Sequence, residues 1–518
     1  MSMQQITESP RLKFKDSMQW LFCGDSRAMV EIPDNFVHCI VTSPPYWGLR
    51  KYAGDQELIW DGDPDCQHVW ESVEIPRKSR STGDRSSLTG GYTSQNKSGT
   101  REKHISGLCS KCGAWKGSLG LEPMPELYLK HIIEIMRECR RVLRPDGVLF
   151  LNIGDSYAGS GKGIGSDHGK AVFSDDDIPK PSWNLSGLKP LDLVLMPQRL
   201  ALALQLDGWY VRSIIIWHKT NAMPESLNGW RFEQHRIKVD KEPDTRTDAG
   251  KQSGMRAHSG YEVTDSAEYI DCPGCPKCLP NNGLILVKGS WRPTDNFEYV
   301  LMLTKTSEYY CDREAVRIEQ TGNAHSRGNG QGDKQYQEER ESYKGFNSLV
   351  AELPQGKNLR SVWTFPSQSS GFKHYAAFPE KLPEICIRAA TPEHGVCAVC
   401  GTPWARVVKQ EPVPDEVFTK TSNPDDGFVA GHRKNGEYHG SGRKYEEWAI
   451  EHPPQTIGWR PSCKCNTALT PVPAVVLDPF NGTGRTMWVA KKLGRRSIGY
   501  DLAYHEMSIQ RNRQGGLL

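Results

Sequence analysis

The stretch from residue 475 to 501 constrains the fold of this chain more than any other. An apolar run leads into a loop with two glycines, in the sequence VVLDPFNGTGRT at 475–486. Residues 486–493 follow with helical spacing, and a second apolar run over 497–501 ends in an acid. A strand, a glycine loop, a helix and a second strand in this order form a parallel β-α-β unit. We therefore predict an α/β fold.

The same stretch predicts a ligand site. Glycines let the backbone approach a ligand closely at the carboxyl end of a parallel strand, and a helix N-terminus favours a carboxylate. Asp501, at the tip of the second strand, is placed to accept hydrogen bonds from ribose hydroxyls. No Gly-Lys-Ser/Thr follows the glycines, so this is not a nucleotide P-loop. A dinucleotide site remains the alternative, because it shares the glycines and the acid.

A second stretch near the other end of the chain carries a stiff loop. The apolar run Val37–Val41 ends in TSPPYW at 42–47. Two prolines fix two φ angles, remove two donors and hold the preceding residues extended, so the backbone carbonyls point outward and are held still. Ser43 and two aromatic side chains flank them. This loop suits a planar substrate whose amino group donates hydrogen bonds, such as a nucleobase; a plain Pro-Pro turn is the alternative.

Together the two stretches resemble motifs IV and I of the amino-methylating DNA methyltransferases. Ser43 to Tyr46 is similar to motif IV, and Asp478 to Gly484 is similar to motif I. Motif IV comes first and motif I last, an order that marks the β class of this family. Weaker resemblances complete the set: motif II at Asp501, motif III at 21–25, motif VIII at 217–221 with Pro224, and motif X at 372–379.

This resemblance implies a Rossmann-like class I methyltransferase fold, with a seven-stranded, mostly parallel sheet, circularly ordered motifs and insertions. It also implies S-adenosylmethionine as cofactor and double-stranded DNA as partner. The Ser43 side chain and the Pro44 carbonyl would accept the protons of the target amine, and Tyr46 would stack on the base. The implied catalytic residues are Ser43, Pro44, Pro45 and Tyr46, and the implied cofactor-binding residues are Asp25, Phe378, Asp478, Phe480, Gly482, Gly484, Thr486 and Asp501.

The target base follows less directly. Within the family, serine at the first position of motif IV is commoner in N4-cytosine enzymes and aspartate in N6-adenine enzymes. Ser43 therefore favours cytosine N4, with adenine N6 as the alternative. Cytosine-C5 enzymes need a cysteine after a proline, and none of the fifteen cysteines follows one.

Two further classes stay open. A zinc-stapled DNA-binding protein without activity would need degenerate motifs, whereas motifs I and IV are intact. An RNA or protein methyltransferase would place motif I before motif IV, the reverse of the order here.

Eleven Cys and His residues fall into groups with metal-ligand spacing. Close pairs separated by a loop are typical of zinc ribbons, and cysteines in polar insertions are poorly explained as core residues. In an intracellular chain the same pattern argues against a disulfide scaffold. We expect structural zinc, and the group at 272–278 lacks an obvious fourth ligand, with His258 or an acid possible. The predicted ligands are Cys66, His68, Cys109, Cys112, Cys272, Cys275, Cys278, Cys397, Cys400, Cys463 and Cys465.

Length and composition limit what can be predicted about size, surface charge and location. At 518 residues the chain exceeds one typical core, and a formal charge of +3 means that any basic surface is local. It has no apolar run of 18 residues, and residues 1–17 lack a signal-peptide core, so we expect no membrane contact and a cytoplasmic protein of a prokaryote or phage. A partner restriction endonuclease is possible. The recognition sequence, this partner and the oligomeric state do not follow from the sequence.

The pattern of ordered and polar stretches predicts a division into regions. The resemblance to the β class implies that DNA target recognition lies between motifs VIII and X, and the basic stretch 77–103 is expected to contact phosphates. Residues in the recognition region that could read base edges are Arg231, Arg236, Arg327, Lys334, Arg340 and Lys344. The regions are 18–60 with 121–224 (catalytic half), 61–120 (Cys/His insertion), 225–360 (target recognition, with a Cys-rich insert at 258–280 and a core strand at 295–312), 361–395 (motif X), 396–466 (four-cysteine insertion) and 467–518 (S-adenosylmethionine-binding half).

Overall fold

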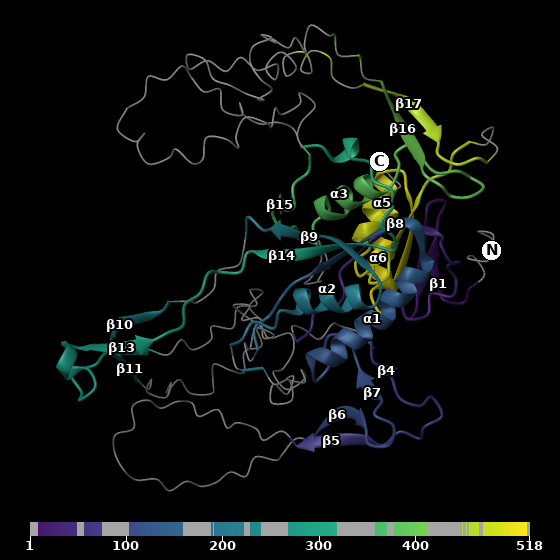
Figure 1. Ribbon diagram of the computed structural model, residues 1–518. Coiled ribbons are helices and arrows are strands. Elements are labelled where there is room, and N and C mark those ends of the chain that lie inside the picture. The colour runs from purple at the N-terminus through teal and green to yellow at the C-terminus, as the bar shows by residue number, and fades with distance from the viewer. Residues whose placement is uncertain are drawn as a thin grey trace, which may run out of the picture. The chain divides into compact units, whose positions relative to one another are not determined.

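A computed structural model describes most of the chain in two compact units (Figure 1). The first unit contains Met1–Glu71, Ile105–Asn221 and Phe297–Leu518, and the second contains Ser72–His104 and Ala222–Asn296. No helix in the part of the chain that the structure describes is long and apolar enough to cross a membrane. The described residues are 9–48, 56–74, 103–158, 188–189, 191–221, 228–239, 268–318, 358–369, 378–409, 411–412, 414, 448, 452, 455–465 and 470–514.

The first unit is built around one mixed sheet, which has nine strands within the described residues. All strands run parallel except β1 and β14, so the predicted α/β fold with a mostly parallel sheet is confirmed. In spatial order the strands are β1 (Leu12–Lys15), β2 (Gln19–Cys23), β19 (Arg496–Asp501), β18 (Val475–Asp478), β3 (Val37–Thr42), β8 (Leu143–Ile153), β14 (Phe297–Thr304), β9 (Tyr210–His218) and β15 (Val362–Thr364).

The predicted number of seven strands was too low by two. The seven strands from β2 to β9 form the expected sheet, and the extra strands extend its two edges. β1 is only four residues long and alternates lysine with apolar residues, and β15 has three residues. Neither contains an apolar run of the kind that made the buried strands recognisable, so both escaped the sequence analysis.

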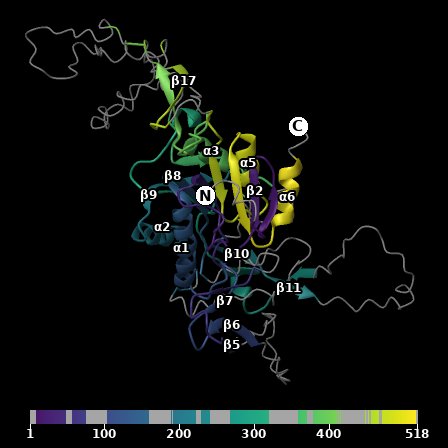
Figure 2. The ribbon, with the colours of Figure 1, turned by 90° about the vertical axis from the view of Figure 1, so that its right-hand side faces the viewer.

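Helices cover both faces of the sheet. One face packs against α1 (Pro125–Val142) and α2 (Met196–Leu206), and the other against α3 (Lys381–Ala390) and α5 (Arg485–Lys492). Figure 2 shows α1 and α2 on one side of the strands and α5 on the opposite side. α6 (His505–Gln514) packs beside α5 and β2. These two layers of buried apolar side chains form the core.

α1 is an amphipathic helix. Pro125 occupies its first turn, where the missing N–H costs no hydrogen bond. Tyr128, Ile132, Met136 and Cys139, spaced by three or four residues, are completely buried against the sheet. β8 follows the helix directly, beginning at Leu143.

Strands from the two ends of the chain lie side by side in the middle of the sheet. β18 pairs in parallel with β3, with Val476 opposite Cys39 and Leu477 opposite Ile40. β18 also pairs in parallel with β19. The carboxyl ends of these strands therefore meet at one edge of the sheet, which brings the proline loop next to the glycine loop. This pairing is what assembles the site.

Smaller sheets accompany the central one. β4 (Leu58–Trp60), β7 (Trp115–Gly117), β6 (Lys103–Cys109) and β5 (Trp70–Glu74) form a four-stranded sheet in this order, and β16 (Trp404–Lys409) pairs with β17 (Gln455–Pro461). In the second unit β10 (Trp230–Gln234) pairs with β13 (Leu284–Lys288), and β11 (Arg236–Val239) pairs with β12 (Glu268–Asp271). Short 3-10 turns lie at Leu279–Asn281 and Glu314–Val316.

Candidate active site

A pocket opens where the carboxyl ends of β2, β3, β18 and β19 meet. It contains about 1000 Å³ of empty space, part of it open to solvent. Most of the residues predicted for catalysis and cofactor binding line it, although they come from opposite ends of the sequence. These are Asp25, Ser43, Pro44, Pro45, Tyr46, Phe378, Asp478, Phe480, Gly482 and Asp501; Gly24, Ser26, Trp60, Pro479 and Asn481 are among the other residues in the lining.

The proline loop is anchored by hydrogen bonds with α1 and with the segment that precedes α1. Tyr128 Oη donates to the Pro45 carbonyl at 2.8 Å. The Trp47 indole, which is 2% exposed, donates to the Glu122 carbonyl at 2.9 Å. Gly120 adopts φ = 91°, and a Cβ there would lie 3.1 Å from the Tyr46 carbonyl oxygen, so only glycine fits this close approach. The loop is therefore fixed before any ligand binds.

Tyr46 belongs to a polar network that the sequence analysis missed. Its hydroxyl donates to Glu298 Oε2 at 2.7 Å and accepts from Asn152 Nδ2 at 2.8 Å and from Ser43 Oγ at 3.2 Å. Asn152 Nδ2 also donates to Glu298 Oε2, at 2.7 Å, and the Lys219 ammonium pairs with Glu298 Oε1. Lys219 lies within the motif VIII stretch at 217–221, whereas Asn152 and Glu298 have no local sequence signal beyond being a polar residue in an apolar strand.

Asp478 fastens the glycine loop to the proline-loop strand. It is buried, and its Oδ1 accepts from Thr42 Oγ1 at 2.7 Å and from the Phe480 N–H at 3.1 Å. Its Oδ2 accepts from Thr486 Oγ1 at 2.7 Å. Burial raises the pKa of Asp478 to about 6, against the effect of these donors. Thr486, predicted to bind cofactor, lies outside the pocket lining and contributes through Asp478.

Asp501 lines the pocket, but its carboxylate also organises the backbone around it. Oδ2 accepts from the Gly482 N–H at 2.7 Å, and Oδ1 accepts from the N–H groups of Ala503 at 2.8 Å and Tyr504 at 2.6 Å. Burial raises the pKa of Asp501 above its ordinary range. Gly484 lies outside the lining: a Cβ on it would come within 2.4 Å of Ser508 Oγ, so this glycine serves the packing of α5 on α6.

Two arginines stabilise the rim of the pocket. Arg27 pairs with Asp25, with 2.6 Å between Nη2 and Oδ2. Arg485, not singled out from the sequence, is 3% exposed and donates to the Phe378 carbonyl and, at 2.9 Å, to the Ser369 carbonyl. Burial lowers the pKa of Arg485 to about 10. The arginine thereby holds both described ends of the motif X segment, whose residues 370–377 lie outside the described part of the chain.

Motif VIII sits at the end of β9. The Trp217 indole donates to the Phe365 carbonyl at 3.0 Å, and the Ser367 N–H donates to Asn221 Oδ1 at 2.8 Å. These bonds join the segment to the strand that leads toward motif X. Pro224 lies outside the described residues.

A buried histidine joins the first insertion to α1 directly behind the pocket. His131 is completely buried, with Nδ1 2.9 Å from Glu122 Oε1 and Nε2 3.2 Å from Asp61 Oδ2. Its ring stacks on Trp60, which lines the pocket, with 4.4 Å between ring centroids. Burial raises the pKa of Glu122 despite the hydrogen bond with His131. No sequence pattern had singled out this group.

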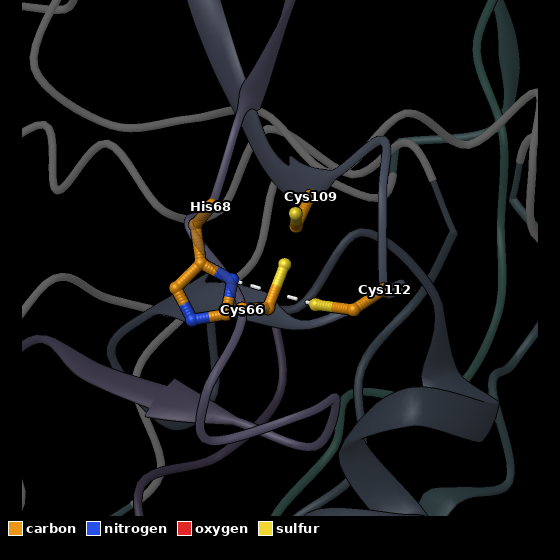
Figure 3. A group of neighbouring side chains, drawn as sticks. All are labelled: Cys66, His68, Cys109 and Cys112. Carbon is orange, nitrogen blue, oxygen red and sulfur yellow. Dashed lines mark hydrogen bonds between the residues drawn. The ribbon is translucent and has the colours of Figure 1, made fainter.

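Three groups of four sulfur and imidazole atoms have the geometry of metal ligands. In each group the ligand atoms all lie within 4.8 Å of one another. The first cluster consists of Cys66, His68, Cys109 and Cys112, which converge on one point in Figure 3 with 3.4 Å between His68 Nδ1 and Cys112 Sγ. The second consists of His235, Cys272, Cys275 and Cys278, and the third of Cys397, Cys400, Cys463 and Cys465.

The structure brings His235 to the second cluster as its fourth member. Its Nδ1 lies 3.4 Å from Cys275 Sγ, and Cys275 Sγ lies 3.7 Å from Cys278 Sγ. His235 lies between β10 and β11, whose pairing partners β13 and β12 flank the three cysteines. His258, one of the ligands considered from the sequence, lies outside the described residues.

The strand order, the pocket and the two loops that meet in it define an α/β methyltransferase. The DNA methylase family of N6 and N4 methyltransferases matches residues 37–398 and 467–511, and the chain belongs to this family. It is a DNA methyltransferase, which confirms the predicted enzyme class, and S-adenosylmethionine is the methyl donor of such enzymes.

The chain is similar to type II methyltransferases over most of their length. The type II methyltransferase M.Cfr9I of Citrobacter freundii is 27% identical over 396 residues, covering 76% of this chain and 78% of the relative. M.SmaI of Serratia marcescens is 24% identical over 374 residues, covering 72% and 75%. Among solved structures, the cytosine-N4-specific PvuII DNA methyltransferase matches with a TM-score of 0.39 and 12% identity, over 97% of this chain and 88% of that one.

Proposed function

We propose that this DNA methyltransferase methylates the exocyclic N4 amine of a cytosine within one short DNA sequence. The observation that carries the proposal is Ser43, which heads the proline loop and lines the pocket. A serine hydroxyl, unlike the aspartate common in adenine enzymes, brings no charge to this position. Adenine N6 methylation is the second candidate, because the same hydroxyl and carbonyl could accept its amine protons.

The residues of the pocket fit S-adenosylmethionine. The glycine loop gives close backbone approach, Phe378 and Phe480 offer apolar contact, and Asp25 and Asp501 offer carboxylates for hydroxyl and amine donors. When bound, the cofactor supplies an electrophilic methyl group on a sulfonium. The pocket residues hold and orient it beside the proline loop.

The proline loop then makes the amine nucleophilic. The lone pair of an exocyclic amine is delocalised into the base, and acceptors for the amine protons localise it on nitrogen. Ser43 Oγ and the Pro44 carbonyl are such acceptors, and the neighbouring Pro45 carbonyl is already engaged by Tyr128. Tyr46 stacks on the base, which must leave the duplex to reach the loop. Positioning and electrostatics carry this mechanism, with no covalent intermediate.

Product analysis tests the proposal directly. Purified protein is incubated with mixed-sequence DNA and S-adenosylmethionine, and the digested nucleosides are identified by mass spectrometry. We expect N4-methylcytosine from the wild type and none from Ser43→Ala. N6-methyladenine as the only product would assign the enzyme to the second candidate, and equal yields from both proteins would rule out the role of Ser43. Single-molecule sequencing of DNA from expressing cells then gives the sequence context.

Each of the three clusters fits a structural zinc ion. Tetrahedral zinc with Zn–S bonds of about 2.3 Å and Zn–N bonds of about 2.0 Å places sulfurs about 3.8 Å apart, and sulfur and nitrogen about 3.5 Å apart. The 3.7 Å between Cys275 and Cys278 and the 3.4 Å from each of two cysteines to a histidine match these separations. Two clusters share a knuckle turn: the N–H groups of Gly113 and Gly401, both at positive φ, donate to the Cys109 and Cys397 carbonyls.

Sequence recognition is assigned to the region 225–360. Of the six basic residues that could read DNA, the structure describes Arg231 and Arg236, paired with Glu233 and Asp271 respectively on exposed strands. The stretch 77–103, proposed to contact phosphates, lies almost wholly outside the described residues. The proposed regions remain 18–60 with 121–224, 61–120, 225–360, 361–395, 396–466 and 467–518. A cognate restriction endonuclease would be the natural partner of such an enzyme.

A further inference from the structure

Glu298 lies behind the proline loop at the start of an antiparallel strand. Because β14 runs opposite to β3 and β8, its beginning lies at the edge where those strands end. Glu298 thereby reaches the Tyr46 hydroxyl at 2.7 Å, and Tyr46 in turn reaches Ser43 Oγ at 3.2 Å. Three oxygens thus form a continuous chain from the pocket to a carboxylate.

Two donor-only groups fix the direction of the hydrogens in this chain. The Lys219 ammonium and the Asn152 amide N–H groups can only donate, and both donate to Glu298. Asn152 also donates to the Tyr46 hydroxyl, so the single hydrogen of Tyr46 points to the carboxylate. Ser43 then donates to Tyr46. The lone pairs of Ser43 are left to face the pocket as acceptors.

We propose that Ser43, Tyr46 and Glu298 form a proton relay that removes the proton released by methylation. The amine nitrogen uses its lone pair to bond the methyl carbon, the C–S bonding pair stays on sulfur as a thioether, and the nitrogen must lose one proton. That proton passes to Ser43 Oγ as Ser43 passes its own to Tyr46, and Tyr46 passes its own to the Glu298 carboxylate. Atoms and charges balance without another reactant.

The surroundings of Glu298 suit the end of such a relay. Its side chain is 16% exposed and that of Lys219 is 25% exposed, so the proton can continue to solvent. Gly154 leaves room for the relay, because a Cβ there would lie 2.9 Å from the Tyr46 ring and 3.6 Å from Glu298 Cγ. The inference rests on the proposed acceptor role of Ser43, but not on which base is methylated.

Glu298→Gln tests the relay, because it keeps the shape of the side chain and removes its ability to take a proton. We measure single-turnover methyl transfer from about pH 5.5 to 9 with saturating DNA and cofactor. The variant is expected to be about 100-fold slower than the wild type across this range, on the scale of general-base effects. Cofactor binding by calorimetry and flipping of a 2-aminopurine target by fluorescence are expected to stay within about twofold of wild type.

Tyr46→Phe is the second variant, because it keeps the stacking ring and breaks the relay in the middle. It is expected to show the same loss of rate, and it tests the relay independently if Glu298→Gln does not fold. Glu384→Gln, on the outer surface of α3, is the matched control with wild-type kinetics. A wild-type rate of methyl transfer in the relay variants overturns the proposal, as does a loss of base flipping as large as the loss of rate. Failure of the proposed function is seen separately, as the absence of any methylated amine from the wild type.

Discussion

At the scale of single residues, the protonation state of Asp478 affects the stability of the folded protein. In the folded protein, burial raises its pKa from 3.8 to about 6. The folded state therefore binds this proton more tightly than the unfolded state. Stability from the group is fully present below about pH 3.8 and is lost as the pH rises through about 6.

Asp478→Asn removes this titration. The wild type loses about 3 kcal/mol of stability relative to the variant as the pH rises from about 4 to about 7, since one pKa unit corresponds to about 1.4 kcal/mol. Urea unfolding of both proteins across this range measures the difference. Asp295→Asn, at an exposed acid of the second unit, is the control and is expected to follow the wild type. A difference independent of pH would contradict the prediction.

Gly154 is a second position where a single added atom, the Cβ of alanine, would change the position of the Tyr46 ring. A Cβ would lie 2.9 Å from Cε2 of Tyr46, within the van der Waals limit, so Gly154→Ala displaces the ring that stacks on the base. We expect single-turnover methylation to fall about 100-fold, the usual effect of a misplacement of about 1 Å, with little change in cofactor affinity. Rapid-quench kinetics and calorimetry test this. Unchanged kinetics would show that Tyr46 moves freely at this site.

At the scale of elements, the contact of β4 and β7 with α1 depends on His131. The ring lies between the carboxylates of Glu122 and Asp61, and breaking a buried hydrogen-bonded network of this kind leaves unpaired polar groups behind. His131→Ala is expected to lower the free energy of unfolding by about 3–5 kcal/mol. Lys130→Ala, which removes only a largely exposed ion pair with Asp61, is expected to cost less than about 1 kcal/mol. Equal effects in denaturant unfolding would show that the buried network adds nothing.

The elements differ in how far the sequence predicts them. Apolar runs and glycines revealed β3, β18, α5 and β19, because burial on both faces requires continuous hydrophobicity. The motif resemblance then predicted Ser43 and Asp501 in one site, and both residues line the pocket. Glu298 could not be found this way, because its contact with Tyr46 depends on the register of β14 against β8, a pairing between residues more than a hundred positions apart.

Arg485, which follows the glycine loop, also acts between elements. It binds the carbonyls on both sides of the motif X segment, so Arg485→Met keeps the aliphatic stem and frees these carbonyls. Because Phe378 lines the pocket, cofactor affinity is expected to fall about tenfold while the affinity for DNA changes little. Calorimetry with S-adenosylmethionine measures the first and fluorescence anisotropy the second. Unchanged cofactor affinity would mean that the segment is held by other contacts.

At the scale of the whole molecule, the site exists only because distant parts of the chain meet. The proline loop comes from the beginning of the sequence and the glycine loop from the end, and β3 and β18 bring them together by direct pairing. The segments between them carry the three Cys and His clusters. The predicted catalytic and cofactor-binding residues thus lie at the central sheet, while the clusters lie in the insertions. Substitutions in the clusters can therefore test the stability of the insertions separately from catalysis.

Metal analysis tests this division across the whole chain. Three clusters predict about three zinc ions per chain by plasma mass spectrometry. His235→Ala is expected to lower this to about two, because its Nδ1 faces Cys275 Sγ in the second cluster, whereas His258→Ala is the matched control and keeps all three. Cofactor binding should survive in both variants, since the pocket belongs to the first unit and His235 to the second. DNA binding should weaken only in His235→Ala. Fewer than one zinc per chain in the wild type, or equal loss in both variants, would contradict the assignment of these ligands.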